Sequence, residues 1–124
     1  MNSGIVLEEQ IKIWGSPFTP EFMNWAFMGT PSMLKLVWSQ IPANLDVLIT
    51  HGPPFQILDM TMDGCNAGCP LLLEKVKVLK PKYHIFGHIH ECYGMREKGE
   101  TAFINASLCN AAYDLVNKPV VIDL

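Results

Sequence analysis

The sequence lacks the features that direct a chain into a membrane, out of the cell or onto nucleic acid. Only 17% of its residues are charged, the net charge is −3 and no run of basic residues occurs, so a nucleic-acid polymer is not an expected partner. A charged residue or a proline interrupts each apolar stretch before it reaches the length of a membrane span. The first residues lack the basic start and apolar core of a signal peptide. These absences favour a cytoplasmic protein with no membrane partner.

The chain has four cysteines and abundant apolar residues. Cys65 and Cys69 have no second Cys or His pair at the spacing of a zinc site, so we interpret all four cysteines as reduced, structural or loop thiols. Hydrophobic residues make up 49% of the 124 residues, which excludes a disordered chain and fits one domain. Part of this apolar surface could face a partner.

Helix and strand patterns alternate along the chain. Apolar residues at helical spacing predict helices at 31–41, with Thr30 as N-cap, and at 69–79. The run at 46–50 is almost continuously apolar, as in a parallel strand buried on both faces. The long loop at 51–68 is typical of a functional segment. Alternation and turn residues predict the other strands at 10–14, 83–86, 94–98, 101–105 and 119–124. This order of elements indicates an α/β layered architecture.

Two histidines separated by one residue follow the strand at 83–86. In an extended segment His88 and His90 would point to the same side, where two imidazoles can ligate one metal ion or two adjacent ions. Gly87 permits a sharp turn before them and leaves no side chain in the way. A His-x-His pair alone is weak support for a metal site, so the interpretation needs a second motif.

A third histidine follows the strand at 46–50. His51 precedes Gly52 and two prolines, which hold the chain in a fixed, non-helical path. Open α/β sheets place their ligand sites at the carboxyl ends of strands, where both motifs lie. A lone histidine after a strand is more often a cap or solvent-facing, but the two motifs together predict a metal site. Alternation puts His84 on the same side as Phe86, so we expect it in the core.

An aromatic-rich segment covers residues 14–27. Its side chains could stack on a base, but a packed hydrophobic cluster is the preferred interpretation. The aromatic residues concerned are Trp14, Phe18, Phe22, Trp25 and Phe27.

The two histidine motifs resemble the last two signature motifs of calcineurin-like metallophosphoesterases. Over nearly all of its length the chain also looks like the C-terminal part of the metallophosphoesterase-domain-containing subfamily. The resemblance implies that residues 1–124 are a partial phosphoesterase domain, the C-terminal half of a four-layer αββα sandwich. The matching segments are Thr50-His51-Gly52-Pro53-Pro54, Gly87-His88-Ile89-His90-Glu91, Ile13-Trp14-Gly15-Ser16-Pro17-Phe18-Thr19-Pro20-Glu21-Phe22, Asn24-Trp25-Ala26-Phe27 and Phe103-Ile104-Asn105-Ala106-Ser107.

The resemblance further implies metal-dependent hydrolysis of a phosphoester, for which the subfamily suggests a phosphodiester such as a cyclic nucleotide. Two divalent ions (manganese, iron or zinc) would clamp the phosphoryl oxygens and activate water. His51 and His88 would bind the second ion, and His90 the first. The residues that would line the site are Gly52, Gly87, Glu91, Asn105 and Ser107. Solvent exposure is the alternative for Glu91, and a turn is the alternative for Asn105 and Ser107.

The other ligand motifs of that family do not occur in this sequence. No Asp precedes a His by two positions, no Gly is followed by Asp, and no Asn is followed by His. Three hypotheses follow: a phosphoesterase whose N-terminal half is absent from this chain, an inactive remnant that binds metal or a partner, and a protein with one zinc ion on three histidines. The remnant hypothesis includes self-association through a sheet face that the missing layers leave uncovered.

Overall fold

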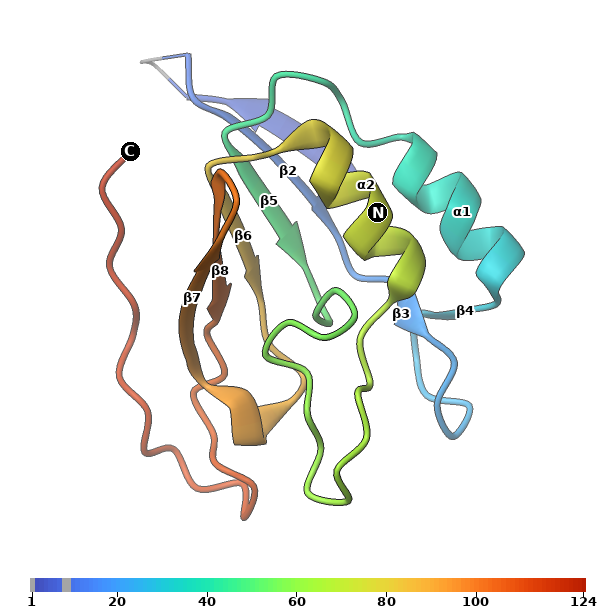
Figure 1. Ribbon diagram of the computed structural model, residues 1–124, viewed down its shortest axis with the longest axis vertical. Helices are drawn as coiled ribbons and strands as arrows, with labels where there is room; N and C mark the ends of the chain where they lie inside the picture. Colours follow the sequence, from blue (N-terminus) through green and yellow to red (C-terminus); the bar gives the residue numbers. More distant parts are fainter. Residues whose placement is uncertain (1, 8–9) are drawn as a thin grey trace.

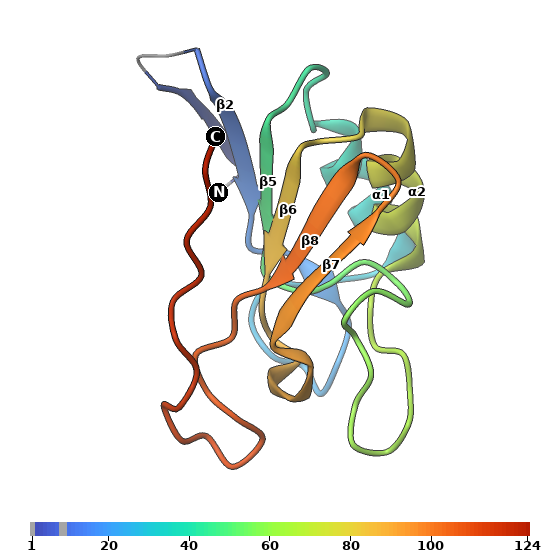
Figure 2. The ribbon, with the colours of Figure 1, turned by 60° about the vertical axis from the view of Figure 1, so that its left-hand side comes forward.

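The chain folds into a six-stranded sheet with two helices on one of its faces (Figures 1 and 2). The computed structural model describes residues 2–7 and 10–124. No helix in these ranges is long and apolar enough to cross a membrane. The elements are β1 (Ser3–Val6), β2 (Lys12–Ser16), β3 (Thr19–Pro20), β4 (Met28–Gly29), α1 (Pro31–Ser39), β5 (Val47–Thr50), α2 (Pro70–Leu79), β6 (Tyr83–Phe86), the 3-10 helix η1 (His90–Cys92), β7 (Gly94–Lys98) and β8 (Thr101–Asn105).

The centre of the sheet is parallel. The strand order is β1-β2-β5-β6-β8-β7, in which β2, β5, β6 and β8 run parallel and the edge strands β1 and β7 pair antiparallel. At the centre, His84 of β6 lies between Leu48 of β5 and Phe103 of β8. Parallel neighbours need crossover connections, which α1 supplies from β2 to β5 and α2 from β5 to β6, while η1 and β7 connect β6 to β8. The α/β class predicted from the order of elements is therefore confirmed.

Both helices begin with a side-chain cap followed by a proline. The Thr30 hydroxyl accepts a hydrogen bond from the Met33 amide at 3.3 Å, as predicted for an N-cap. In α2 the cap is a cysteine, because the Cys69 sulfur accepts from the Leu72 amide at 3.4 Å. The same sulfur accepts from the indole N–H of Trp38 at 3.4 Å. One buried thiol therefore caps α2 and fixes α1 against it.

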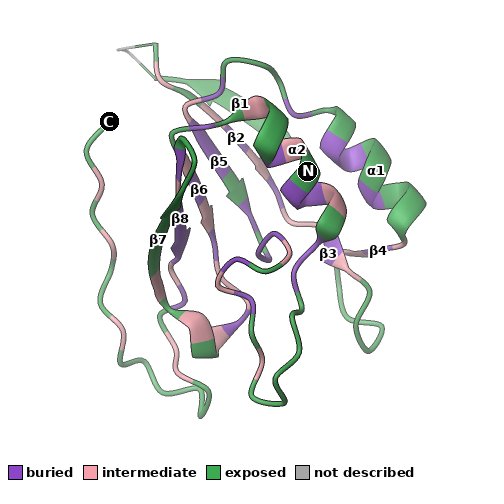
Figure 3. Cartoon of the chain, viewed as in Figure 1, coloured by how far each residue is buried: buried purple, intermediate pink, exposed green. Residues whose placement is uncertain are grey.

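The hydrophobic core lies between the helices and the sheet face that they cover (Figure 3). Alternate strand residues point to this face, and helical residues at i, i+3 and i+4 meet them. Each fully buried apolar side chain contributes about 1.5–3 kcal/mol, which holds the helices on the sheet. The principal contributors are Trp14, Leu48, Phe86 and Phe103 from the strands and Leu34, Trp38, Leu72 and Val76 from the helices.

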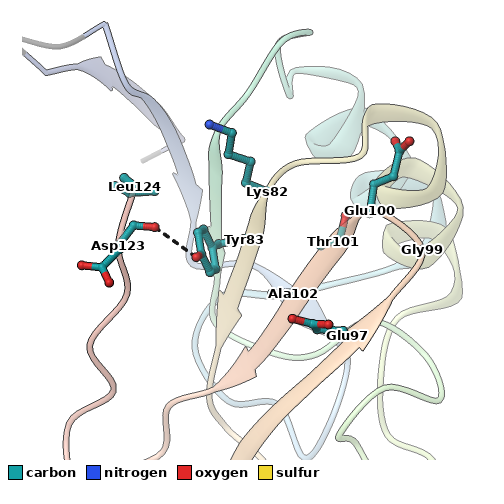
Figure 4. Close-up of a pocket in the computed structure, with 9 residues that line it drawn as sticks. All are labelled: Lys82, Tyr83, Glu97, Gly99, Glu100, Thr101, Ala102, Asp123 and Leu124. Atoms are coloured by element: carbon teal, nitrogen blue, oxygen red, sulfur yellow. Dashed lines mark hydrogen bonds between the residues drawn. The ribbon is translucent and has the colours of Figure 1, made fainter.

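The other face of the sheet is only partly covered. Ile49 lies on this face and is 43% exposed, so the expectation that residues 46–50 are buried on both faces is wrong there. The segment after β8 runs over this face (Figure 2), where the Tyr83 hydroxyl donates to the Asp123 carbonyl at 3.1 Å. That bond lies in the wall of a cleft of about 360 Å³ at the starts of β6 and β8, and no histidine lines this cleft (Figure 4).

Two strand predictions need correction, and β1 was not predicted. Residues 119–124 form no strand, because this segment lies over a face of the sheet, where ladder hydrogen bonds cannot form. The strand predicted at 10–14 runs instead from Lys12 to Ser16, since its pairing with β5 continues through Gly15. The pattern gave no indication of β1, which is exposed along its whole length.

His84 is fully buried at the centre of the sheet, which confirms its prediction as a core residue. Thr50 donates its hydroxyl proton to the Gly52 carbonyl at 2.7 Å, so the imidazole Nε2 donates to that hydroxyl at 2.8 Å. Nδ1 is then left without a hydrogen-bond partner among the described residues. Burial lowers the pKa of His84 from 6.5 to about 3, so the ring is neutral in the folded protein.

The buried neutral ring makes stability depend on pH. The unfolded chain binds a proton at this imidazole near pH 6.5, whereas the folded chain binds it only near pH 3. The contribution of His84 is thus complete above pH 6.5 and is lost as the pH falls toward 3. The slope is about 1.4 kcal/mol per pH unit. Urea unfolding from neutral to moderately acid pH should show a shallower pH dependence for His84→Gln, by about that slope. Equal slopes in the two proteins would contradict this account.

Candidate metal centre

The ends of β5 and β6 carry the two predicted histidine motifs side by side. His51 follows β5 directly, and His88 lies two residues beyond β6. The Gly87 amide donates to the His51 carbonyl at 3.0 Å, which joins the two turns. Because β5 and β6 are parallel, their carboxyl ends meet at one edge of the sheet, where α/β folds bind ligands.

The rings of His51 and His88 are in direct contact. Nε2 of His51 lies 3.0 Å from Nδ1 of His88, and the ring centroids are 4.6 Å apart. This spacing is that of a hydrogen bond between the two rings, whereas a tetrahedral ion with each nitrogen about 2.0–2.1 Å away would hold the nitrogens about 3.3–3.4 Å apart. A small separation of the two rings would therefore let both nitrogens face one divalent ion.

Both rings have a lowered pKa. Partial burial lowers the pKa of His51 below its usual 6.5. Burial is also the largest cause for His88, whose pKa is lowered further by positive charge on His51 or His90 and raised in part by the Glu91 carboxylate. Neutral imidazole is the form that binds a metal ion, so this environment favours the ligating form of both rings.

His90 lies apart from this pair. It begins η1, and its Nδ1 donates to the Asn110 carbonyl at 3.2 Å, while its ring meets that of Tyr113 at a centroid distance of 5.2 Å. The extended geometry expected for residues 88–90 is wrong, because His88 has a φ of 70° and a 3-10 turn begins at His90. In the part of the chain that the structure describes, no group of three or more His, Cys, Asp or Glu side chains is placed to hold a metal ion.

Two glycines allow the turns to pack closely around the histidine pair. A Cβ on Gly52 would lie 2.6 Å from the Thr19 hydroxyl oxygen, closer than such atoms approach, and 3.8 Å from Cδ2 of His88. A Cβ on Gly87 would lie 3.3 Å from the Ser107 hydroxyl oxygen. Both predicted glycines therefore lie beside the pair, where their role is close backbone approach.

Asn105 lies beneath the turn that carries His88 and ties it to the loop that follows His51. Its side-chain amide donates to the Ile89 carbonyl at 2.8 Å and to the Leu58 carbonyl at 3.3 Å, and its oxygen accepts from the Ser107 amide at 3.1 Å. Ile89 separates the two histidines of the second motif, and Leu58 belongs to the loop after the first. Asn105 is fully buried, so it supports the site from below and does not line an open surface.

The two remaining predicted residues face different surroundings. Glu91 is exposed, and its carboxylate accepts from the Met62 amide at 2.9 Å, which fastens the long loop after His51 to η1. Ser107 is buried, and its hydroxyl has no partner within the described residues. Neither side chain makes a hydrogen bond to His51 or His88 in the described contacts.

Two relatives decide the family. The chain is 44% identical over 132 residues to a UPF0046 protein of Caenorhabditis elegans, and the alignment covers 100% of this chain and 33% of that protein. It is also 44% identical over 116 residues to human metallophosphoesterase domain-containing protein 1, which covers 91% of this chain and 36% of that protein. The chain belongs to the metallophosphoesterase-domain family. It spans about a third of the length of these two relatives.

A solved crystal structure shares the fold of this metallophosphoesterase-domain chain. The two align with a TM-score of 0.58 and 23% identity over 85% of this chain and 44% of the other. At that identity the likeness supports the fold alone. No protein-family model matches the chain.

The surroundings of His90 were not predicted from the sequence. The Asn110 side-chain oxygen accepts from the Ala112 and Asp114 amides at 2.9 and 3.0 Å. This tight turn brings the Tyr113 ring against His90. An asparagine at the start of a turn was the available signal, because its side chain commonly bonds the backbone two residues on. The signal gave no indication of which surface the turn would meet.

Removing the Asn105 amide should destabilise the fold. Asn105→Ala removes the side-chain partner of the Leu58 carbonyl and of the Ser107 amide and leaves the Ile89 carbonyl with the Cys92 amide alone, which should lower the free energy of unfolding by about 2–4 kcal/mol in urea titrations. The matched control is Asn66→Ala, an exposed position in the long loop, which should change stability by less than about 0.5 kcal/mol. Equal effects of the two substitutions would show that Asn105 does not tie the turns together.

Proposed function

We propose that this chain carries one divalent-metal subsite of a metal-dependent phosphoesterase, with His51 and His88 as ligands of one ion. The observation that carries the proposal is the 3.0 Å contact between their ring nitrogens at the ends of two parallel strands. Membership of the metallophosphoesterase-domain family supports the reaction class, hydrolysis of a phosphoester. Imidazole suits zinc and iron and also occurs on manganese, so these are the metals proposed.

In this proposal the chain's own residues prepare the subsite. The imidazoles of His51 and His88 are kept neutral by burial, and Asn105 fixes the turn that carries His88. A bound ion supplies positive charge for the phosphoryl oxygens and acidifies water. In the overall reaction water adds to phosphorus, the bond from phosphorus to the ester oxygen breaks, and that oxygen receives a proton.

Two imidazoles do not complete the two-ion site that the resemblance implies. His90, the expected ligand of the other ion, donates instead to the Asn110 carbonyl. The same orientation disfavours one zinc ion on three histidines, because His90 would have to turn toward the pair. Since the chain spans about a third of its relatives, we propose that the remaining ligands belong to the longer protein. Hydrolysis of a phosphodiester such as a cyclic nucleotide would then require those ligands.

A second candidate function is an interaction module that associates with itself. The supporting observation is the partly covered sheet face, where Ile49 is exposed at the centre of the sheet. The segment over this face is held by side-chain bonds from Tyr83 and Tyr93 and exposes apolar residues of its own. Exposed apolar surface of this kind favours association.

Metal binding should depend on His88 and much less on His90. Elemental analysis after dialysis against zinc or manganese should find about one ion per chain. Loss of a residue that only supports a ligand lowers metal affinity by roughly 10–100-fold, so His88→Ala, which removes a ligand, should lower it by more. The matched control, His90→Ala, should retain the ion, because its ring lies apart from the pair. Affinity should fall in acid, as the pH drops through the lowered pKa values of the two imidazoles, because protons then compete with the ion for both rings.

The proposal fails if wild-type protein binds no ion, or if His90→Ala loses it as completely as His88→Ala. Hydrolysis of a generic phosphodiester in manganese tests activity separately. If the wild type is active and His88→Ala abolishes the activity, this chain alone suffices for hydrolysis. That result would contradict the proposal that the remaining metal ligands belong to the longer protein.

Self-association should depend on the open sheet face. Light scattering should give a mass above that of one chain, and Ile49→Lys should return it toward the monomer, because a charge on this face opposes burial. Val78→Lys is the matched control, since Val78 is 77% exposed on α2, which covers the opposite face. A sharp monomer in the wild type, or equal dissociation by both substitutions, would exclude this function.

A further inference from the structure

A cleft of about 290 Å³ lies between α2 and the hairpin of β7 and β8. It opens near the start of β8, whereas the histidine pair follows the ends of β5 and β6, and no histidine lines it. The hairpin turn lies beside the end of α2 (Figure 1), where Lys80 and Glu100 form an ion pair of 3.5 Å at the rim. This cleft is therefore separate from the candidate metal centre.

The inner wall of the cleft is apolar. The Thr101 hydroxyl also lines it but already donates to the Pro81 carbonyl at 2.7 Å. Water in such a space finds few hydrogen-bond partners, so an apolar group displaces it at little cost. The apolar residues of this wall, all buried in the fold, are Ile57, Leu73, Val76 and Phe103.

The rim of the cleft is positively charged, although the whole chain has a net charge of −3. Lys77, Lys80 and Lys98 line it together with one carboxylate, that of Glu100, which gives a local sum of +2. Glu74 does not line the cleft but pairs with Lys77 at 2.9 Å, and with its charge included the sum is +1. The carbonyl end of α2 adds about half a negative charge, which leaves the sum positive. The rim therefore attracts one anionic group and no more.

The size and lining of the cleft restrict the apolar part of the ligand. Three of its four apolar wall residues are aliphatic, and lysine side chains border such clefts with their methylene stems. A volume of 290 Å³ has room for about ten methylene-sized groups of about 30 Å³ each. The cleft thus fits a single aliphatic chain of medium length and is too small for a lipid with two long chains.

We propose that this cleft binds a straight-chain aliphatic monocarboxylate of up to about ten carbons. The chain lies against Leu73, Val76 and Phe103, and the carboxylate lies at the rim beside Lys98, which has no ion pair among the described residues. The proposal depends on neither the metal subsite nor self-association, so it is tested on the whole chain without added metal.

Nuclear magnetic resonance of the ¹⁵N-labelled chain locates the ligand and measures its affinity. Octanoate should shift the amide signals of Val76, Thr101 and Phe103. It should bind about tenfold more tightly than hexanoate, because two more methylenes are buried, whereas dodecanoate should gain nothing over decanoate once the cleft is full. Shifts centred on Ile49 of the open sheet face, or affinity that does not rise from hexanoate to octanoate, would overturn the proposal.

The position of the carboxylate is tested with octan-1-ol and a charge reversal. The wild type should bind octanoate about three- to tenfold more tightly than octan-1-ol, and Lys98→Glu should remove that preference while still binding the alcohol. The matched control is Lys35→Glu, an exposed lysine of α1 that does not line the cleft and should keep the preference. Melting temperatures report whether each variant is folded. Equal affinity of the wild type for the two probes, or equal loss in both variants, would overturn the carboxylate position.

Vesicles of phosphatidylglycerol distinguish a free carboxylate from a membrane surface as the partner of these lysines. The chain should not sediment with them, because its net charge is −3 and the rim sum is small. Sedimentation that Lys98→Glu abolishes and octanoate does not reverse would show that the lysines contact a membrane, and would overturn the free carboxylate as the ligand.

Discussion

The parallel pairing of β5 with β6 is the interaction on which the candidate site depends. It begins in the strands, where Leu48 lies opposite His84, and continues beyond them to the bond between the Gly87 amide and the His51 carbonyl. This pairing brings His51 and His88 within hydrogen-bond distance across 37 positions of sequence. A slip of one residue would turn His84 to the open face and separate the two rings, because strand side chains alternate between faces.

Buried polar groups fix this register. Thr50 links the His84 ring to the Gly52 carbonyl, directly beneath the turn that carries His51. Asn105 does the same beneath the turn that carries His88, through the Ile89 carbonyl. Apolar side chains in these two places would fill the core but would remove the hydroxyl donor from the Gly52 carbonyl and leave the Ile89 carbonyl with the Cys92 amide alone. The sheet therefore positions the site through two interior hydrogen-bond relays, one under each histidine.

The sequence predicted those parts of the fold that depend on local pattern. The Thr30 cap, the strand at 83–86 and the hairpin of β7 and β8 follow from spacing and turn residues, and the structure has them as predicted. Features that depend on contacts between distant segments were missed. Ile49 was expected to be buried because strand composition does not reveal which face is covered, and residues 88–90 were expected to be extended because local pattern does not reveal a left-handed residue.

The candidate site, too, was predicted only in those parts that depend on local pattern. The motifs placed His51 and His88 at the carboxyl ends of two strands, where open α/β sheets bind ligands, and the structure brings them together. The turn at Asn110 that takes His90 away depends on loops that meet only in the folded chain, and so does the exposure of Phe22 and Trp25, which were expected in a packed cluster. The chemistry of each side chain could thus be predicted from the sequence, whereas its neighbours in the folded chain could not.

The segment after β8 gives the molecule two tiers of local stability. Residues 118–124 make no backbone-to-backbone hydrogen bond in the described part of the chain, and the Tyr83 and Tyr93 hydroxyls hold two of their carbonyls. Amide protons there can exchange with solvent without any opening of the sheet. Those of β5 and β6 are protected until the centre of the sheet opens. Residues 118–124 can therefore detach from the second face and rebind without disturbing the histidine pair, which lies at the carboxyl ends of β5 and β6.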